Sequence, residues 1–176
     1  NDVAIEGFAA LVHATKGRRN PGLVLCEYGP DVQASRRLIQ RLGIERNVHW
    51  LPMMYRKDLM VGLDMADISV AQFGLSIVHN GVIAEALALG KPVMLRRDDA
   101  LYGSILPSLY EAMNAQNSEE AAALFLDYER NPGRYEEMGR KGREWFLRHA
   151  VEEPLGELMT RMGRTRPKPF KHIGGC

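Results

Sequence analysis

Glu85 is the residue of this sequence whose chemistry fits its surroundings least well. It lies in an apolar segment, residues 82–89, whose composition predicts a helix buried on most of its surface. A buried carboxylate must be paired, solvated through a pocket or protonated. Two interpretations are therefore open. Either Glu85 pairs with a neighbouring Lys or Arg or faces water, or it accepts hydrogen bonds from the hydroxyl groups of a bound sugar.

A polar loop, residues 74–80, precedes this helix and carries Ser76, His79 and Asn80, and Gly81 opens the helix. A short buried strand is predicted before the loop. Ligands of open parallel sheets bind outside the carboxyl ends of the strands, and the free amides of a helix start favour phosphate. The loop and the helix start thus predict a site for a phosphate-containing ligand, with Glu85 one turn further in.

The flanking residues fix the limits of this unit. Ile68, Val70 and Phe73 are apolar and β-prone, which is typical of a buried strand. Gly90 is placed to end the helix in a left-handed conformation, and Pro92 prevents the helix from continuing. Another strand is predicted at residues 93–95, so that the segment as a whole reads strand, loop, helix, strand.

The rest of the chain alternates in the same way. Helices are predicted at residues 2–14, at 32–42 after a cap at Asp31, and from a cap at Asp58 to Met65; buried strands are predicted at 23–26 and 48–51. This alternation predicts an α/β fold, a Rossmann-like parallel sheet flanked by helices. Because the pattern begins on a helix, its first strand is expected to be missing.

After residue 95 the pattern becomes helical. Residues 96–101 are expected to form a charged loop, residues 105–113 are ambiguous between helix and strand, and Ser118 is expected to start a helix that ends at residues 131–133. Amphipathic helices are expected at 135–146 and 151–162. We expect residues 1–163 to form one domain and residues 164–176 a flexible tail.

Composition excludes several classes of protein. The chain has 176 residues, a net charge of +1, 45% hydrophobic and 26% charged residues, which is ordinary for a globular domain and implies no nucleic-acid partner. No apolar run approaches the length of a membrane span, and no secretory signal opens the chain. The two cysteines do not form a disulfide framework: Cys26 is expected in the core and Cys176 at the surface. A reducing cytoplasm is therefore expected.

Five segments together resemble the C-terminal, donor-binding half of a group 1 glycosyltransferase with the GT-B fold. Residues 23–30 are similar to the family's strand ending in Gly-x-Gly-Pro, and residues 42–52 to its Leu-Gly-Leu and Val-x-Phe-Leu-Gly segment. Residues 65–70 resemble its Ala-Asp-Val strand. Residues 85–93 are similar to its Glu-Ala-Met-Ala-x-Gly-Lys-Pro-Val signature, and residues 131–143 to its closing Asp-Pro, Met-Gly and Gly-Arg pattern. Their order is specific for this fold.

The resemblance implies a nucleotide-diphosphate sugar as substrate, with a uridine or guanosine base, and no cofactor or metal. In that case Glu85 matches the acid that holds the ribose hydroxyls, and the helix start matches the backbone that meets the diphosphate. The donor-binding residues implied are Glu85, Val82, Gly81, Asn80, His79, Leu51, Pro52 and Lys57. Several of these residues also have a simple interpretation that involves no ligand. Leu51 and Pro52 could only end a strand, Lys57 could be a solvated surface charge, and a lone loop histidine such as His79 is more often structural or exposed.

Two departures from the family weaken the expectation of activity. The first acid of the paired motif falls at position 77, which is Ile77 here. The family's Arg and Lys that neutralise the diphosphate precede the first helix, so Lys16, Arg18 and Arg19, which follow it, do not match them. The acceptor-binding N-terminal half is absent as well, and catalytic residues cannot be assigned.

The resulting expectation is a donor-binding domain of an enzyme that transfers a sugar to a glycan, lipid or other acceptor. The resemblance implies a hexosyltransferase of polysaccharide biosynthesis that retains anomeric configuration without a metal. It would work in the cytoplasm, or at the inner face of a membrane reached only through the absent half, and the domain alone should be inactive. The alternatives are a non-catalytic GT-B-like binding module and an epimerase of nucleotide sugars.

Overall fold

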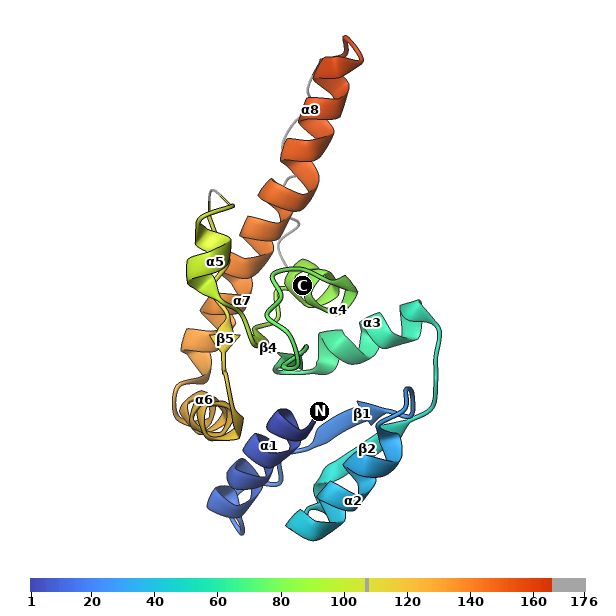
Figure 1. The fold of residues 1–176 in the computed structure, drawn as a ribbon, viewed down its shortest axis with the longest axis vertical. Coiled ribbons are helices and arrows are strands. Elements are labelled where there is room, and N and C mark those ends of the chain that lie inside the picture. Colours follow the sequence, from blue (N-terminus) through green and yellow to red (C-terminus); the bar gives the residue numbers. More distant parts are fainter. Residues whose placement is uncertain (107, 166–176) are drawn as a thin grey trace.

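The structure is a computed structural model that describes residues 1–106 and 108–165 of the chain. Its eight α-helices within these ranges are α1 (Asp2–Thr15), α2 (Val32–Leu42), α3 (Arg56–Met65), α4 (Gly81–Ala88), α5 (Asp99–Gly103), α6 (Ser118–Arg130), α7 (Pro132–Phe146) and α8 (Glu153–Arg161). The strands are β1 (Leu23–Cys26), β2 (Val48–Leu51), β3 (Ser69–Val70), β4 (Val93–Leu95) and β5 (Met113–Asn114). Figure 1 shows their arrangement.

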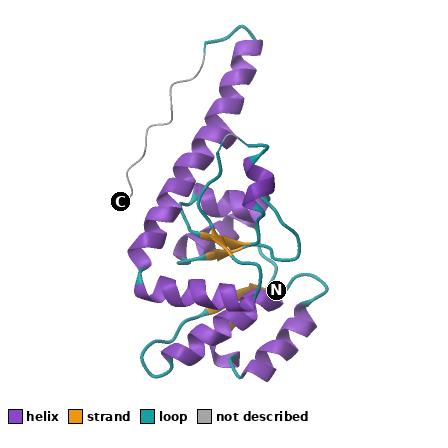
Figure 2. Ribbon diagram, turned by 60° about the vertical axis from the view of Figure 1, so that its left-hand side comes forward, coloured by secondary structure: helices purple, strands orange, loops and turns teal. Residues whose placement is uncertain are grey.

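All the strand pairs are parallel, but they form two sheets. β1 pairs with β2, with Leu23 opposite Val48 and Cys26 opposite Leu51. The second sheet has the order β3-β4-β5. Helices surround the strands (Figure 2). The predicted α/β class with a parallel sheet flanked by helices is therefore confirmed, and the strands at residues 23–26, 48–51 and 93–95 have the predicted limits.

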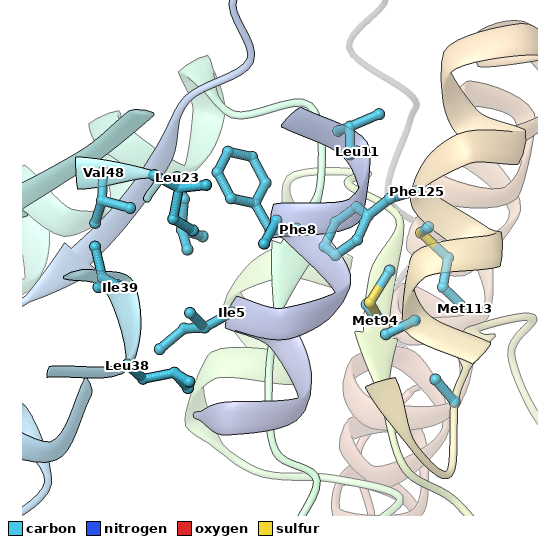
Figure 3. Close-up of a cluster of buried hydrophobic side chains, with 14 of the residues drawn as sticks. Ile5, Phe8, Leu11, Leu23, Leu38, Ile39, Val48, Met94, Met113 and Phe125 are labelled. Atoms are coloured by element: carbon cyan, nitrogen blue, oxygen red, sulfur yellow. The ribbon is translucent and has the colours of Figure 1, made fainter. Parts of the chain in front are cut away.

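Helix α1 organises the larger apolar core. Ile5 and Phe8 on its buried face contact a cluster that includes Leu23 of β1, Met94 of β4 and Phe125 of α6 (Figure 3). The rings of Phe8 and Phe125 meet edge to face with centroids 6.2 Å apart. Burial of each such side chain stabilises the fold by about 1.5 to 3 kcal/mol. Helix α1 thus links the two sheets.

Helix α4 is fixed by a second cluster. Ile83 and Leu87 are buried with the β4 residues Val93 and Leu95. Gly90 ends the helix with φ of 71°, and its amide donates to the carbonyl of Leu87 at 3.0 Å, as the left-handed cap predicted. The start of α4 is therefore held at a defined place relative to the sheet.

Strand β1 differs from the fully buried strand that its apolar sequence predicted. Val24 is 56% exposed and Cys26 is exposed, so the expectation that Cys26 packs in the core was wrong. Leu23 is buried in the cluster that contains Ile5 and Phe8 of α1, whereas Val24 and Cys26 on the opposite face of the strand are exposed. An apolar run of residues indicates a strand that can be buried, but it does not indicate which face of the strand another element covers.

Several element limits also differ from the prediction. Helix α3 begins at Arg56 after Tyr55, so Asp58 lies in its first turn and is not its cap. The expected loop at 96–101 contains the start of α5, whose cap Asp98 accepts a hydrogen bond from the Leu101 amide.

Helix α6 starts at Ser118, as predicted, and Asn117 caps it by accepting a hydrogen bond from the Glu120 amide at 2.9 Å. Helices α7 and α8 are joined by a π-helical segment, Leu147–Glu152, without the expected break. Of the predicted tail, residues 166–176, including Cys176, lie outside the described residues. Among residues 1–106 and 108–165, no helix is long and apolar enough to cross a membrane.

Asp127 ties α6 to α7. Its carboxylate accepts hydrogen bonds from Asn131 Nδ2 at 2.7 Å, Arg134 Nη1 at 2.9 Å and the buried Tyr135 hydroxyl at 2.6 Å. The hydrogen bond from Tyr135, followed by that from Asn131, lowers the pKa of Asp127 below its ordinary 3.8. Burial, together with the Asp127 carboxylate, raises the pKa of Tyr135 to about 12. The cluster therefore requires an ionised Asp127 and a neutral Tyr135.

This linkage predicts how acid acts on the protein. Because the pKa of Asp127 is lower in the folded chain than in the unfolded one, its stabilisation is complete above pH 3.8 and is lost as the pH falls through the lowered value. We expect Asp127→Asn to lower the melting temperature at pH 7 and the difference from wild type to shrink below pH 4. Thermal unfolding followed by circular dichroism from pH 7 to pH 2 measures both, with Glu111→Gln as a control at an exposed acid. A difference that does not change with pH would contradict the role of Asp127.

Candidate functional site

The start of α4 presents backbone amides to the C-terminal edge of the sheet. The side chain of its cap, Asn80, accepts a hydrogen bond from the Ile83 amide at 2.9 Å, and the Asn80 carbonyl accepts from the Ala84 amide at 2.9 Å. The amides of Gly81 and Val82 have no such partner within the helix. No acidic residue lies in this first turn. The free amides and the helix dipole therefore make a place for an anion.

Glu85 lies one turn further along the same helix. The residue is 8% exposed, and its Oε1 lies 2.7 Å from Nε of Arg56, whose side chain is 76% exposed. The first of the two interpretations, pairing with a basic residue, is thus observed. It does not exclude the second, because a carboxylate has about four lone-pair sites and a single Arg56 nitrogen occupies one of them.

A cleft of about 1380 Å³ opens beside Glu85. Of the residues predicted to bind a donor, Glu85, Val82 and Leu51 line it. Asn80 and Gly81 adjoin Val82 in the chain, so the structure brings the helix start, the carboxylate and the end of β2 to one region. Leu51 is 37% exposed, as expected of a residue available to a ligand.

The other predicted residues lie at the surface. Pro52 and Lys57 are exposed, between the end of β2 and the first turn of α3. His79 is exposed in the loop before α4, and no hydrogen bond or ion pair joins it to another residue of the described ranges. None of these three residues lines the cleft.

The loop before α4 is anchored from behind by residues of the β4–β5 connection. The Asp98 amide donates to Ser76 Oγ at 2.8 Å, and the Tyr102 hydroxyl donates to the Ser76 carbonyl at 3.1 Å. The Tyr110 hydroxyl donates to the Val78 carbonyl at 2.7 Å. Ser76, which was one of the polar residues of the predicted site, therefore serves to hold the loop.

A buried arginine supports this anchor. Arg97 is 3% exposed; its Nη2 donates to the Tyr110 carbonyl at 2.9 Å, and its guanidinium lies 4.6 Å from the centroid of the Tyr110 ring. Its Nε pairs with Asp99 Oδ1 at 2.5 Å. Burial raises the pKa of the Tyr110 hydroxyl, and the Arg97 charge opposes that rise. The sequence placed Arg97 in a charged loop, and nothing in its local pattern distinguishes it from the exposed arginines.

Removal of the Tyr110 hydroxyl should loosen the loop. Tyr110→Phe leaves the Val78 carbonyl without its donor, and we expect a loss of about 1.5 kcal/mol in the free energy of unfolding. Urea denaturation measures it, and hydrogen exchange should be faster at residues 76–80. Tyr102→Phe, which removes a longer hydrogen bond to the same loop, is the comparison, and it should lower the free energy of unfolding by a smaller amount. Equal stability of Tyr110→Phe and wild type would show that the hydroxyl does not hold the loop.

The sequence matches a known family over most of its length. Residues 2–145 match the model of the family described as "Glycosyl transferases group 1". The chain belongs to this family. No curated protein sequence matches the chain. The family match covers α1 to α7 and therefore includes the helix start, Glu85 and the cleft.

Solved structures that resemble this group 1 domain have the GT-B fold. Anabaena HepE, solved in complex with UDP-glucose, has a TM-score of 0.67 and 15% identity, and the match covers 90% of this chain and 44% of HepE. Sucrose-phosphate synthase from Thermosynechococcus elongatus has a TM-score of 0.62 and 20% identity over 90% and 42% of the two chains. A putative UDP-N-acetylglucosamine 2-epimerase from Listeria monocytogenes has a TM-score of 0.56 and 17% identity, and the match covers 95% of this chain and 43% of the epimerase. The chain thus spans less than half the length of these proteins.

Ile77 occupies the position where the group 1 resemblance leads one to expect an acid. It is half-buried and packs against the cluster that contains Ile83 and Leu87, and its amide donates to the Arg96 carbonyl at 3.2 Å. The apolar side chain therefore contributes to the support of α4 and offers no hydrogen bond to a sugar. Within the described part of the chain, no three His, Cys, Asp or Glu side chains come together as metal ligands.

Proposed function

We propose that this chain is the donor-binding domain of a glycosyltransferase that uses a nucleotide-diphosphate sugar. The observation that carries the proposal is the pair of groups at the start of α4. The unpaired amides of Gly81 and Val82 lie one helical turn from the buried carboxylate of Glu85, and Glu85 and Val82 both line the cleft. One end of this arrangement suits an anion and the other suits hydroxyl donors.

The proposed binding mode follows from these two halves. The diphosphate accepts hydrogen bonds from the amides of Gly81 and Val82 and is stabilised by the dipole of α4. The ribose hydroxyls donate hydrogen bonds to the Glu85 carboxylate, which also forms the ion pair with Arg56. The base lies toward Leu51, with Pro52 and Lys57 beside it, and His79 contacts the phosphate or the sugar.

The neighbours solved with UDP and UDP-glucose favour uridine, and guanosine remains the alternative base. The transfer is proposed to be that of a hexosyl group, without a cofactor or metal, with retention of configuration and with helix amides stabilising the leaving diphosphate. A separate N-terminal domain would supply the acceptor site for polysaccharide biosynthesis in the cytoplasm, with any membrane contact made through that domain. Catalysis would need both domains, so the isolated domain is expected to be inactive.

Calorimetric titration with UDP, UMP and GDP tests the proposal. If the helix start binds the diphosphate, UDP should bind at least tenfold more tightly than UMP, a difference of about 1.4 kcal/mol. The ratio of UDP to GDP affinity then names the base. Equal affinity for UDP and UMP, or no binding of any nucleotide, would contradict the proposed donor site.

Ile77 favours a second candidate, a non-catalytic binding module. Without an acid at this position the site could retain nucleotide binding through Glu85 while it lacks the contact to the sugar. A nucleotide-sugar epimerase is a third candidate, since one of the similar structures is described as a putative epimerase. Because the isolated domain is expected to be inactive under the first proposal, the test uses a form of the protein that contains both domains. Its incubation with UDP-glucose and UDP-N-acetylglucosamine, followed by chromatography of the products, distinguishes hydrolysis or transfer, epimerisation and the absence of turnover.

A further inference from the structure

The dipeptide Asn80-Gly81 combines two residues that can react with each other. When glycine follows asparagine, the backbone nitrogen of the glycine can attack the asparagine carboxamide, because glycine has no Cβ to hinder the approach. The other asparagines, each followed by a residue other than glycine, are Asn1, Asn20, Asn47, Asn114, Asn117 and Asn131. The sequence therefore favours this reaction at Asn80 over every other asparagine of the chain.

The structure leaves the reacting groups of this dipeptide accessible. Gly81 is exposed, a Cβ built on it meets no atom within 4 Å, and its amide, the first of α4, has no acceptor in the helix. Asn80 Oδ1 accepts the hydrogen bond from the Ile83 amide at 2.9 Å, which polarises the carboxamide and holds it beside the first turn. Among residues 1–106 and 108–165, no group forms a hydrogen bond with Asn80 Nδ2. The attacking nitrogen and the leaving group are thus both free.

We propose that Asn80 is a site of spontaneous deamidation and that its modification lowers the affinity of the donor site. The Gly81 nitrogen forms a bond to Asn80 Cγ, the bond from Cγ to Nδ2 breaks, and ammonia leaves with the proton of the Gly81 amide. Water then opens the cyclic imide at one of its two carbonyl carbons and returns a proton to the nitrogen. The product is aspartate or isoaspartate at position 80, and water is the only co-reactant.

The reaction places a carboxylate where the proposed function places a diphosphate, so this part of the inference rests on that proposed function. The first turn of α4 carries no acidic residue before the reaction. The helix dipole keeps a carboxylate at the cap ionised, and its charge then repels a second anion. Isoaspartate also adds a methylene group to the main chain and displaces the amides of Gly81 and Val82. A modified chain should therefore bind UDP at least about fivefold more weakly.

Asn117 is a matched control within the same chain. It caps α6 with φ of −149° and ψ of 177°, against −154° and −177° at Asn80, and it accepts a hydrogen bond from the Glu120 amide at 2.9 Å. Ser118 follows it in place of glycine, its Nδ2 donates to Glu120 Oε1 at 3.1 Å, and Glu119 and Glu120 oppose a further negative charge. Asn117 should therefore keep its amide under conditions in which Asn80 loses it.

Incubation of the protein at mildly alkaline pH in water enriched in heavy oxygen tests the chemistry. Peptide mass spectrometry should show the amide at position 80 replaced by a carboxyl group with one heavy oxygen, and isoaspartyl methyltransferase should label the same peptide. Gly81→Ala, whose Cβ has room, should slow the reaction by about tenfold or more, because the added Cβ hinders the attack. Equal rates at Asn80 and Asn117, or an unchanged rate in Gly81→Ala, would overturn the assignment of the site.

Calorimetric titration with UDP tests the consequence and separates it from the proposed function. Asn80→Asp should bind UDP at least about fivefold more weakly than fresh wild type, and incubated wild type should approach the same affinity. Asn80→Ser keeps a helix cap but has no amide to lose, so incubation should not change its affinity.

The outcomes of this titration are distinct. If fresh wild type binds no UDP, the proposed donor site and the loss of affinity are both wrong, and the mass measurement alone decides the deamidation. If fresh wild type binds UDP and Asn80→Asp binds it equally well, the donor site is supported and the inferred loss of affinity is overturned.

Discussion

Substitution of Glu85 by glutamine should weaken the binding of UDP by about 30-fold, or about 2 kcal/mol. Glutamine has nearly the same shape but carries no charge, and hydrogen bonds to charged groups are worth about 1.5 to 3 kcal/mol. The buried carboxylate beside the amides of Gly81 and Val82 is the acceptor that we assign to the ribose. Calorimetric titration of wild type and variant with UDP measures the ratio directly.

Two further variants separate recognition from an indirect effect on α4. Arg56→Gln removes the partner of Glu85 but leaves the carboxylate, so UDP affinity should change by less than about threefold. Glu111→Gln removes an exposed acid of the β4–β5 connection and should have no effect. If Glu85→Gln and Arg56→Gln weaken binding equally, the ion pair matters only as a support and the assignment of Glu85 to the ribose is wrong.

Substitution of Gly139 by alanine should destabilise the protein by about 3 kcal/mol or more. Helix α7 crosses the end of α4 at this glycine, and a Cβ built on it would lie 2.0 Å from the Gly90 carbonyl oxygen. Backbone cannot yield as a side chain can, so the two helices must separate. Thermal unfolding should show a fall in melting temperature of about 6 to 12 °C.

Two other glycines of α7 serve as controls for this prediction. A Cβ at Gly133 meets no atom within 4 Å, so Gly133→Ala should leave the melting temperature unchanged or raise it slightly through its helix propensity. A Cβ at Gly142 would lie 2.8 Å from Leu87 Cδ2, a flexible contact, and Gly142→Ala should have an intermediate effect. A Gly139→Ala variant as stable as Gly133→Ala would show that α7 does not approach α4 so closely.

Local sequence signals predicted the central unit well. The helix predicted at residues 82–89 is observed at Gly81–Ala88, and its end at Gly90 and the strand at Val93–Leu95 are as predicted. These features depend on short-range rules, namely apolar spacing, a left-handed cap and a following proline. The pairing of Glu85 with a basic side chain was one of two open interpretations, and the sequence could not name Arg56, which lies on a different helix. Contacts between distant segments are set by the fold.

The features that the sequence did not predict are those that depend on what covers a surface. Arg97 reads as one more charged residue in a polar loop, and only the fold shows that it is buried against Tyr110. The sequence predicts that the β1 residues Val24 and Cys26 are buried in the core, but both are exposed in the structure. Both differences arise because burial depends on neighbouring elements, which the local sequence pattern does not report.

An NMR titration of the protein with UDP shows directly whether the start of α4 binds the diphosphate. We expect the amide signals of Gly81 and Val82 to shift most on addition of UDP, and Glu85→Gln to reduce the affinity but to leave these two signals as the ones that respond. UMP, which lacks the second phosphate, should shift them less. Shifts confined to other parts of the chain, or equal shifts with UMP and UDP, would contradict the claim that the start of α4 binds the diphosphate.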